Sequence, residues 1–372
     1  MKWIDTPTTL GPVLESVASA RMIGIDTEAD SLHSYFDKVC LVQISADEQD
    51  FLIDPLAGLD LAPLGAITAN PATVKVLHGA DYDIRILHRD FGFTFHNLID
   101  TMICAQLLGE KAVGLAALLE RYFGVQLDKS HQRADWAMRP LPPRMAEYAA
   151  MDTRYLLGLV EILRARLIEL GRWEWAEDEF RRLEAIRWSG APADEERFRR
   201  LKGIARFEPR NLEVVSRLYD WRDGMARRLD RPPFKVIGND ALVALAEHLP
   251  RNRQELGRVS GVSGYHLAKY GRELLETIET ALEVPEQELP EKRRGRPWIR
   301  DDQLEKRIRR LKDARDRVAG ELNIDPAILA PKHVLAAIVA SGVRAPEDLG
   351  KIEAMRDWQR RVVGPALLAA LR

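Results

Sequence analysis

Two acidic residues, Asp26 and Glu28, are the residues of this sequence whose type and spacing most clearly indicate chemistry. They follow the apolar stretch Met22–Ile25, which predicts a buried strand, and side chains two positions apart lie on the same face of a strand. Two neighbouring carboxylates raise each other's pKa, and a shared cation relieves their repulsion. The pair therefore indicates a divalent metal site, unless the strand simply ends in a solvated turn, where acidic residues are common.

A second group of candidate residues lies where a short strand predicted over Val74–Leu77 gives way to a helix predicted over Asp81–Arg89. Functional groups of open α/β sheets gather at such positions. Asp81 could cap the helix, which leaves Asp83 in the first turn, either as a partner of the helix dipole or as a ligand that faces the first acid pair. His78 is either a structural histidine at the strand end or a substrate contact.

The third candidate acid, Asp152, lies in a long segment with helical spacing. The pattern of Arg144–Ala165 predicts one helix with a single apolar face, and Tyr148 and Asp152, four residues apart, share one side of it. Asp152 falls on the stripe that is predicted to be buried, where an unpaired charge is costly. A metal ion shared with the other acids would satisfy it.

The elements that must position these residues predict an α/β domain with a mixed sheet. Lys38–Ala46 and Asp50–Asp54 predict two strands that follow the first one, joined by a hairpin at Asp47–Gln49, and the three strands are predicted to be antiparallel. The remaining predicted elements are a weak helix over 55–69, a strand over 93–99, and helices over 101–108 and 114–123.

Together the three acidic motifs resemble those of a known family. Asp26-x-Glu28, His78-x4-Asp83 and Tyr148-x3-Asp152 are similar, in order and spacing, to the motifs of the DEDD exonuclease superfamily, in the subclass whose last motif is Tyr-x-x-x-Asp, and within it to the ribonuclease D family. The resemblance extends over roughly residues 3–186. It includes the stretch Asp135-Trp136-Ala137-Met138-Arg139-Pro140-Leu141 ahead of the last motif.

The resemblance implies a ribonuclease H-like fold and 3′→5′ hydrolysis of RNA with two divalent cations. In the family pattern Asp26 would bind both cations, Glu28 and Asp152 would complete the site that activates the attacking water, and Asp83 would hold the second cation, largely through waters. Tyr148 would orient the attacking water. Oxygen ligands favour Mg²⁺ or Mn²⁺ over zinc. The implied substrates are structured RNA precursors, foremost the trailing nucleotides of transfer RNA.

Two interpretations apply to the ring-bearing residues that follow the first motif, which are His33, Tyr35 and Phe36. Aromatic rings can stack on the bases of terminal nucleotides, with about 1 to 3 kcal/mol for each base. They can equally pack in the protein core.

The second half of the chain predicts only helices, arranged as two copies of one unit. The predicted organisation is an exonuclease domain over 1–188, a linker over 189–206 that includes a basic helix from Arg197, a helical bundle over 207–282, a linker over 283–297 and a second bundle over 298–372. In Asn239–Pro250 and Glu255–Val262 above all, the first bundle resembles the helicase-and-ribonuclease-D C-terminal (HRDC) domain.

A shift of 93 positions without a gap aligns the two bundles. It aligns Arg217–Asp223 with Arg310–Asp316 and Gly271 with Gly364, and it also pairs Tyr265 with Trp358, both predicted as core anchors. The sequence therefore predicts a duplicated HRDC-like domain.

Basic residues in and near the bundles are the candidates for RNA contacts. The cluster of Lys292, Arg293, Arg294 and Arg296 could neutralise phosphates, or could simply belong to a solvated linker. Further candidates are Lys235, Lys269 and Arg272. The bundles hold no group of residues that indicates catalysis, so they are predicted to bind and position RNA.

Composition narrows the class of protein. The 372 residues are 46% hydrophobic and 30% charged, with a net charge of −2, which is typical of a globular protein and argues against a uniformly basic surface. There is no apolar signal core in Met1–Leu14 and no apolar run of about 18 residues, so no membrane span is predicted. Cys40 and Cys104 lie in apolar runs, as expected in a reducing compartment, and a cytoplasmic monomer is predicted.

The sequence thus predicts a metal-dependent 3′→5′ exoribonuclease. Two other functions share its features. A DNA-directed exonuclease would use the same five residues, although no polymerase or helicase segment supports it. A non-catalytic RNA-binding protein would keep the fold, but the full set of four acids with Tyr148 argues against a degenerate site.

Overall fold

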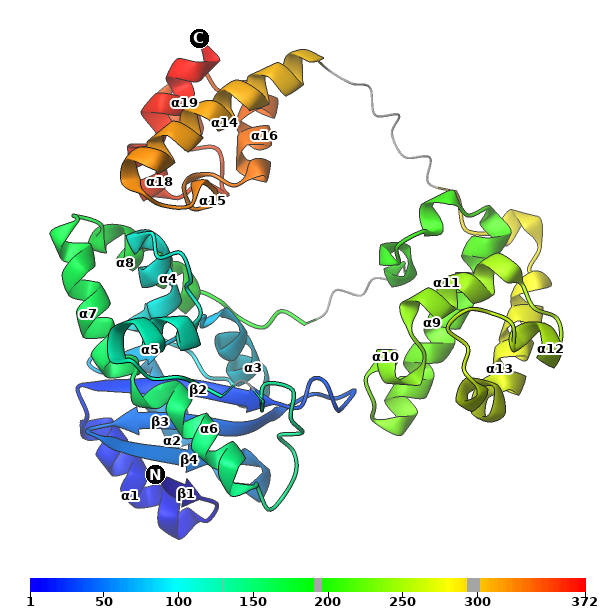
Figure 1. Cartoon of the computed structure of the whole chain (residues 1–372), viewed down its shortest axis with the longest axis horizontal. Coiled ribbons are helices and arrows are strands. Elements are labelled where there is room, and N and C mark those ends of the chain that lie inside the picture. The colour runs from blue at the N-terminus through cyan, green and yellow to red at the C-terminus, as the bar shows by residue number, and fades with distance from the viewer. Residues whose placement is uncertain (129, 191–195, 293–301) are drawn as a thin grey trace. The chain divides into compact units, whose positions relative to one another are not determined.

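The computed structural model describes residues 1–128, 130–190, 196–292 and 302–372 (Figure 1). The described chain forms two compact units. The first contains the described residues of Met1–Ala29, Val39–Trp188 and Ile299–Arg372, and the second contains those of Asp30–Lys38 and Ser189–Trp298. The helices within these ranges include none that is long and apolar enough to cross a membrane.

A six-stranded mixed sheet forms the centre of the first unit, which confirms the predicted α/β class. The strand order is β1-β4-β3-β2-β5-β6. β2, β3 and β4 are antiparallel neighbours, as predicted, whereas β5 and β6 continue from β2 in parallel and β1 is parallel to β4. The strands are β1 (Lys2–Ile4), β2 (Met22–Ala29), β3 (Val39–Ala46), β4 (Gln49–Ile53), β5 (Val74–Leu77) and β6 (Leu98–Asp100).

The predicted hairpin between β3 and β4 is present and is one residue shorter than expected. Its two turn residues, Asp47 and Glu48, have positive φ angles of 45° and 62°. Two consecutive residues with positive φ form the tight turn whose twist suits a hairpin, and Asn, Asp and Gly favour it. Gln49 therefore already belongs to β4.

Helices cover both faces of the sheet, and Figure 1 shows α6 lying across β3 and β4. Apolar side chains from the sheet and from α1, α3, α4 and α7 form the main core of this unit. The helices of this part are α1 (Pro7–Ser19), α2 (Ala62–Ala69), α3 (Asp81–Phe91), α4 (Thr101–Leu108), α5 (Leu115–Phe123), α6 (Pro143–Arg154), α7 (Leu156–Glu169) and α8 (Trp173–Glu184).

The prediction of one long helix over Arg144–Ala165 is wrong. The segment forms α6 and α7, which meet at Tyr155, where φ is −99° and ψ is −4°. α6 packs on β2, β3 and β4, whereas α7 packs on α4 and β5. The chain has to change direction between these two surfaces, and the residues at the break, Arg154 to Leu156, include no Gly or Pro that would signal it.

Several other boundaries differ from the prediction. The strand predicted over 93–99 is limited to β6. Phe93 and Phe95 lie in the segment before β6, where their side chains are buried but the backbone does not pair with another strand. The segment 55–69 is a 3-10 turn (Pro55–Ala57) followed by α2, and the basic segment from Arg197 forms two 3-10 turns, Arg197–Arg200 and Ile204–Arg206, instead of a helix. The sequence analysis missed β1 and α1.

The described helices of the two bundles begin at positions that differ by 93 residues, in agreement with the predicted duplication. α9 (Pro209–Leu229), α10 (Pro233–Val236), α11 (Asn239–His248), α12 (Arg253–Leu256) and α13 (Gly264–Leu282) correspond to α14 (Asp302–Leu322), α15 (Pro326–Leu329), α16 (Lys332–Ala340), α17 (Pro346–Leu349) and the pair α18 (Asp357–Val362) and α19 (Gly364–Leu371).

The matched aromatic residues Tyr265 and Trp358 have different environments. Trp358 is fully buried, as predicted. Tyr265 is 53% exposed and its side chain is not part of the core of the first bundle, so the prediction for it is wrong. Its position at the first turn of α13 leaves the ring beside Lys269, whose Nζ donates to the Tyr265 hydroxyl over 2.9 Å.

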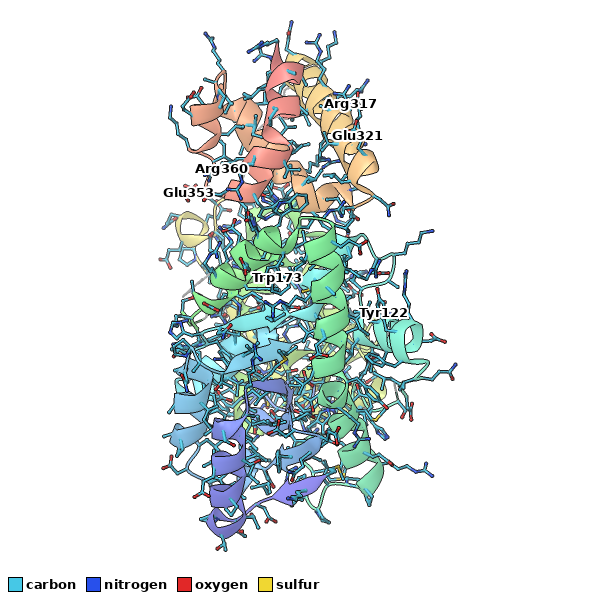
Figure 2. All side chains as sticks on the ribbon, turned by 90° about the vertical axis from the view of Figure 1, so that its left-hand side faces the viewer. Tyr122, Trp173, Arg317, Glu321, Glu353 and Arg360 are labelled. Carbon is cyan, nitrogen blue, oxygen red and sulfur yellow. The ribbon has the colours of Figure 1, made fainter. Side chains whose placement is uncertain are left out.

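The bundle of α14–α19 packs against α8 within the first unit. The indole of Trp358 stacks on that of Trp175, with ring centroids 5.0 Å apart and an interplanar angle of 10°. Glu179 accepts hydrogen bonds from Trp358 Nε1 (2.9 Å) and Arg356 Nε (3.1 Å). Figure 2 shows Trp173 at the start of α8 and Arg360 on α18, on the two sides of this contact.

Candidate active site

Three of the predicted acids meet at one point of the first unit. A carboxylate oxygen of Asp26, one of Glu28 and one of Asp152 all lie within 4.8 Å of one another, and all three residues are partly buried. Asp26 and Glu28 emerge from the same face of β2, as predicted from their spacing, and Asp152 comes from α6. Residues separated by more than a hundred positions are thus brought together on the face of the sheet that α6 covers.

The close packing of α6 on β2 explains why Asp152 reaches the strand. Gly24 lies beneath the end of α6, and a Cβ atom at this position would come within 3.1 Å of the Thr153 carbonyl oxygen. The Thr153 hydroxyl also forms a hydrogen bond of 2.7 Å with the Ser45 hydroxyl on β3. Arg154 Nε donates to the Asp50 carboxylate over 2.8 Å, which fixes the same end of α6 to β4.

Asp83 lies beside this cluster, in the first turn of α3, and is 7% exposed. Its carboxylate accepts a hydrogen bond from the Thr27 hydroxyl on β2. The Asp83 charge contributes to the raised pKa of both Asp26 and Glu28, so the four acids form one electrostatic group.

The cap predicted for α3 is wrong. Asp81 is the first residue of the helix and pairs with Arg85, and Ala80 at the cap position has no capping side chain. Asp100, at the end of β6, instead holds the turn that leads into α3. Its carboxylate accepts hydrogen bonds from the backbone N–H of Gly79 (3.0 Å) and Ala80 (2.8 Å), as well as capping its own helix α4. The sequence analysis missed Asp100, although an acid directly before a helix is a recognisable cap signal.

Burial raises the pKa of every acid in the group, and repulsion by the neighbouring acids raises those of Asp26 and Glu28 further. Burial is the main cause for Asp26 and Glu28, followed by the charges of neighbouring acids, and the pKa of Glu28 reaches about 9. Burial also raises the pKa of Asp83 to about 7, although the Thr27 hydrogen bond lowers it, and it raises the pKa of Asp152 to about 7. Carboxylates in this state gain strongly from a bound cation, which favours their charged forms.

Tyr148 lies one helical turn before Asp152 on α6. Its ring contacts His131 and Trp136, with ring centroids 5.9 Å and 6.0 Å away. Burial, followed by the charges of Asp152, Glu28 and Asp26, holds the pKa of the hydroxyl well above its usual range. The hydroxyl therefore stays protonated and can donate a hydrogen bond next to the acids.

A structured loop supports Tyr148 from outside the helix. Arg139 forms two hydrogen bonds of 2.6 Å with the Asp54 carboxylate and donates to the Cys40 carbonyl over 2.7 Å. This holds the stretch that contains Trp136, which is 2% exposed, against β3 and β4. The role of Arg139 and Asp54 was not predicted, because nothing in the sequence pairs residues 85 positions apart.

The other predicted site residues, His78, Tyr35 and Phe36, are not part of the acidic cluster. His78 Nδ1 is 2.9 Å from the Thr101 hydroxyl at the start of α4. Within the second unit, the backbone N–H groups of Tyr35 and Phe36 both donate to Asp230 over 3.0 Å, and the Tyr35 hydroxyl donates to Asp223 over 2.9 Å. Phe36 is exposed. Tyr35 thus packs on the first bundle, and the alternative of core packing describes it well.

The candidate RNA-binding cations are only partly within the described residues. Arg293, Arg294 and Arg296 lie outside them, and Lys292 pairs with Glu208. Lys235 lies 3.3 Å from His33 Nδ1, and Arg272 pairs with Glu276 over 2.6 Å. Arg272 is largely exposed, so its pairing is a weak surface interaction.

The donor set fits a hard divalent cation. Among the described residues, the cluster at β2 and α6 consists of carboxylates only, without a histidine or cysteine. Carboxylate oxygens suit Mg²⁺ and Mn²⁺, whereas zinc sites normally include nitrogen or sulfur ligands. A group of four acids with raised pKa values is what an oxygen-ligand site shows when no cation balances the charge.

Comparisons with known proteins agree with this geometry. A family model described as 3′-5′ exonuclease matches residues 1–168, and one described as HRDC domain matches residues 211–278 and 305–371. Ribonuclease D of Acidiphilium cryptum is 32% identical and covers 97% of this chain and 90% of its own length. Ribonuclease D of Escherichia coli is 34% identical over 77% of this chain and 76% of its own length.

A solved structure extends the agreement to the whole chain. The crystal structure of Escherichia coli RNase D, described as an exoribonuclease involved in structured RNA processing, has a TM-score of 0.74 and 28% sequence identity. The match covers all of this chain and 98% of the other one.

Proposed function

Because the chain belongs to the ribonuclease D family and is a 3′→5′ exoribonuclease, we propose that it hydrolyses RNA with two divalent cations, Mg²⁺ or Mn²⁺, held by Asp26, Glu28, Asp83 and Asp152. The convergence of three carboxylate oxygens within 4.8 Å of one another is the observation that carries this proposal. When bound, the two cations would ionise the attacking water and stabilise the departing 3′ oxygen.

The protein residues supply position and hydrogen bonds. β2 presents Asp26 and Glu28 side by side, the first turn of α3 presents Asp83, and α6 presents Asp152 from the other side. The Thr27 hydroxyl donates to Asp83 and so restricts the rotation of that carboxylate. Tyr148, protonated because its pKa is raised, would donate to the attacking water and orient it towards the phosphate.

The substrates that we propose are structured RNA precursors, foremost the 3′ trailing nucleotides of transfer RNA. The Escherichia coli relative, described as acting in structured RNA processing, supports this choice. The proposed division of labour is an exonuclease domain over 1–188, linkers over 189–206 and 283–297, and RNA-binding bundles over 207–282 and 298–372. The protein would work as a monomer, in the cytoplasm, where the buried thiols of Cys40 and Cys104 stay reduced.

Substitution of the acids tests the metal site. Asp26→Ala and Asp152→Asn should each abolish hydrolysis of a 5′-labelled RNA oligonucleotide in Mg²⁺, while RNA binding in Ca²⁺ is retained. Ladders that shorten from the 3′ end are the readout. Substantial Mg²⁺-dependent activity in both variants would refute the ligand assignment.

A paired assay tests the choice of substrate. RNA and DNA oligonucleotides of the same sequence are incubated with the wild-type protein in Mg²⁺ and in Mn²⁺. We expect shortening of the RNA and little change in the DNA, because ribose 2′-hydroxyl groups allow a protein to distinguish the two. Equal rates on both would point to a DNA-directed enzyme.

A further inference from the structure

Gln43 lies in the middle of the catalytic face of the sheet and has no part in the chemistry described above. It occupies the centre of β3 and is 0% exposed. Within the described part of the chain, neither Oε1 nor Nε2 of its side chain has a hydrogen-bond partner. Buried primary amides without partners are costly and rare in native proteins, so each one calls for an explanation.

The strand register places Gln43 next to a catalytic acid. Gln43 is paired directly with Asp26 on β2 and, on its other side, directly with Leu52 on β4. Residues directly opposite in an antiparallel pair lie on the same face of the sheet, with Cβ atoms about 4.5 to 5.5 Å apart. A glutamine side chain spans this distance, and Leu52 offers no hydrogen-bonding group.

Other neighbours on this face are occupied or apolar. Two positions along β3, the Ser45 hydroxyl already bonds to Asp50 (2.8 Å) and to Thr153 (2.7 Å). α6 covers this face with Ala149 and Ala150, which belong to the same apolar cluster as Leu52 and carry no side-chain acceptor. The Asp26 carboxylate is therefore the charged acceptor directly beside the Gln43 amide.

We propose that Gln43 is a positioning residue for the catalytic site: when cations are bound, its Nε2–H, which has no partner within the described part of the chain here, donates to the Asp26 carboxylate and fixes the orientation of that ligand. The proposal rests on the proposed function of Asp26 as a metal ligand. Donors of this kind orient a ligand carboxylate and favour its charged form, and loss of one typically weakens metal binding by about 10- to 100-fold.

Gln43→Met tests the proposal, since Met keeps the length of the side chain and removes the donor. Mn²⁺ binding to the full chain without RNA is followed by electron paramagnetic resonance. The Kd for Mn²⁺ should rise about 10- to 100-fold. The Mg²⁺ concentration for half-maximal hydrolysis should rise with it, while KM for RNA at saturating Mg²⁺ stays unchanged, because Gln43 does not contact RNA in this proposal.

Leu52→Met is the matched control. It changes the shape of the residue on the opposite side of Gln43, at the same level of the sheet, without altering a polar group. We expect wild-type Mn²⁺ affinity for this variant. A similar loss of affinity in both variants would show a packing effect and overturn the positioning role.

Two outcomes separate this inference from the proposed function. If Asp26→Ala loses Mn²⁺ binding while Gln43→Met binds Mn²⁺ as the wild type does and melts at a higher temperature, Gln43 is an unused buried amide and the inference is wrong. If Asp26→Ala itself keeps Mn²⁺ binding and activity, the proposed metal site is wrong first.

If Gln43→Met does not fold, a structure of the wild-type protein with Mn²⁺ tests the hydrogen bond between Gln43 and Asp26 directly. Gln43 Nε2 within about 3.2 Å of an Asp26 carboxylate oxygen would support the proposal. Donation from Nε2 to any other group would overturn it.

Discussion

The acids of the site make the stability of the folded protein depend on pH. In the folded protein without metal, burial raises the pKa of Asp83 and Asp152 to about 7 and that of Glu28 to about 9. Their unfolded values are about 4, so between pH 5 and 8 the folded state binds more protons than the unfolded state. Stability from these groups is therefore present at low pH and is lost as the pH rises through the folded pKa values.

We predict that the metal-free protein melts at a lower temperature at pH 8 than at pH 5, and that Asp152→Asn makes this decrease smaller by about 2 °C or more. Mn²⁺ should raise the melting temperature at pH 8 more than at pH 5, because binding needs the charged carboxylates. Calorimetry across the pH range is the measurement, and Asp178→Asn on α8, where the carboxylate pairs with Arg181 away from the site acids, is the control. Parallel pH curves for wild type and Asp152→Asn would contradict the prediction.

The hydroxyl of Tyr148 should affect the rate and leave metal binding unchanged. Tyr148→Phe keeps the ring between His131 and Trp136 and removes the donor beside Asp152. We expect single-turnover hydrolysis to slow by about a hundredfold, which is the usual effect of a misplaced reactant, with an unchanged Kd for Mn²⁺. A variant with the wild-type rate would leave the hydroxyl without a role.

Among the elements, the contact between α6 and β2 determines the geometry of the site. Gly24→Ala would place a Cβ atom 3.1 Å from the Thr153 carbonyl oxygen, so α6 has to shift, and Asp152 shifts with it. We predict a loss of about 1 to 3 kcal/mol in the free energy of unfolding, as overpacked cores show, together with weaker Mn²⁺ binding.

Gly11→Ala provides the control for this substitution. Gly11 lies inside α1, and a Cβ atom there meets nothing within 4 Å. Alanine in a helix interior is more favourable than glycine by about 0.5 to 1 kcal/mol, so this variant should be slightly stabilised, with unchanged activity. Denaturant unfolding of both variants gives the comparison, and a stabilised Gly24→Ala would show that α6 does not depend on this close approach.

The sequence predicts local elements better than it predicts where they meet. The spacing of Asp26 and Glu28 on one strand, and the position of Asp83 in a first helical turn, follow from strand and helix periodicity. The meeting of Asp152 with Asp26 was predicted only through motif order, because the packing of α6 on Gly24 is a tertiary contact. Tyr155 gave no signal for the break between α6 and α7.

Residues with structural roles at the site were the least predictable. Gln43 is one of two polar residues, with Ser45, in the otherwise apolar strand β3, and its proposed role depends on the register that pairs it with Asp26. Asp100 and Arg139 act on backbone groups of distant segments. By contrast, Thr6 and Pro7 before α1 are ordinary helix-start signals that could have revealed this missed helix.

At the scale of the whole molecule, the second bundle is held against the exonuclease fold within the first unit. Trp358 of the second bundle is buried against Trp175 of α8, with Glu179 accepting hydrogen bonds from both Trp358 and Arg356. Buried interfaces of this kind make two folded parts unfold together. The second bundle should therefore contribute to the stability of the exonuclease fold.

We predict that Trp358→Ala destabilises the first unit by about 3 to 5 kcal/mol, the usual cost of removing a buried tryptophan, and separates the melting of the second bundle from that of the exonuclease fold. Tyr265→Ala at the matched position of the first bundle should have little effect, since its side chain is 53% exposed. Differential scanning calorimetry distinguishes one transition from two. Equal effects of both substitutions would show that the α8 contact does not hold the second bundle.

Because the helices of the two bundles are offset by a constant 93 residues, each bundle can serve as the reference for the other. A helix position of one bundle therefore has a twin in the other, and at many positions, such as Tyr265 and Trp358, the twins differ in side chain and surroundings. Exchanging twin residues, one pair at a time, would reveal which differences adapt the second bundle to its contact with α8, without recourse to another species.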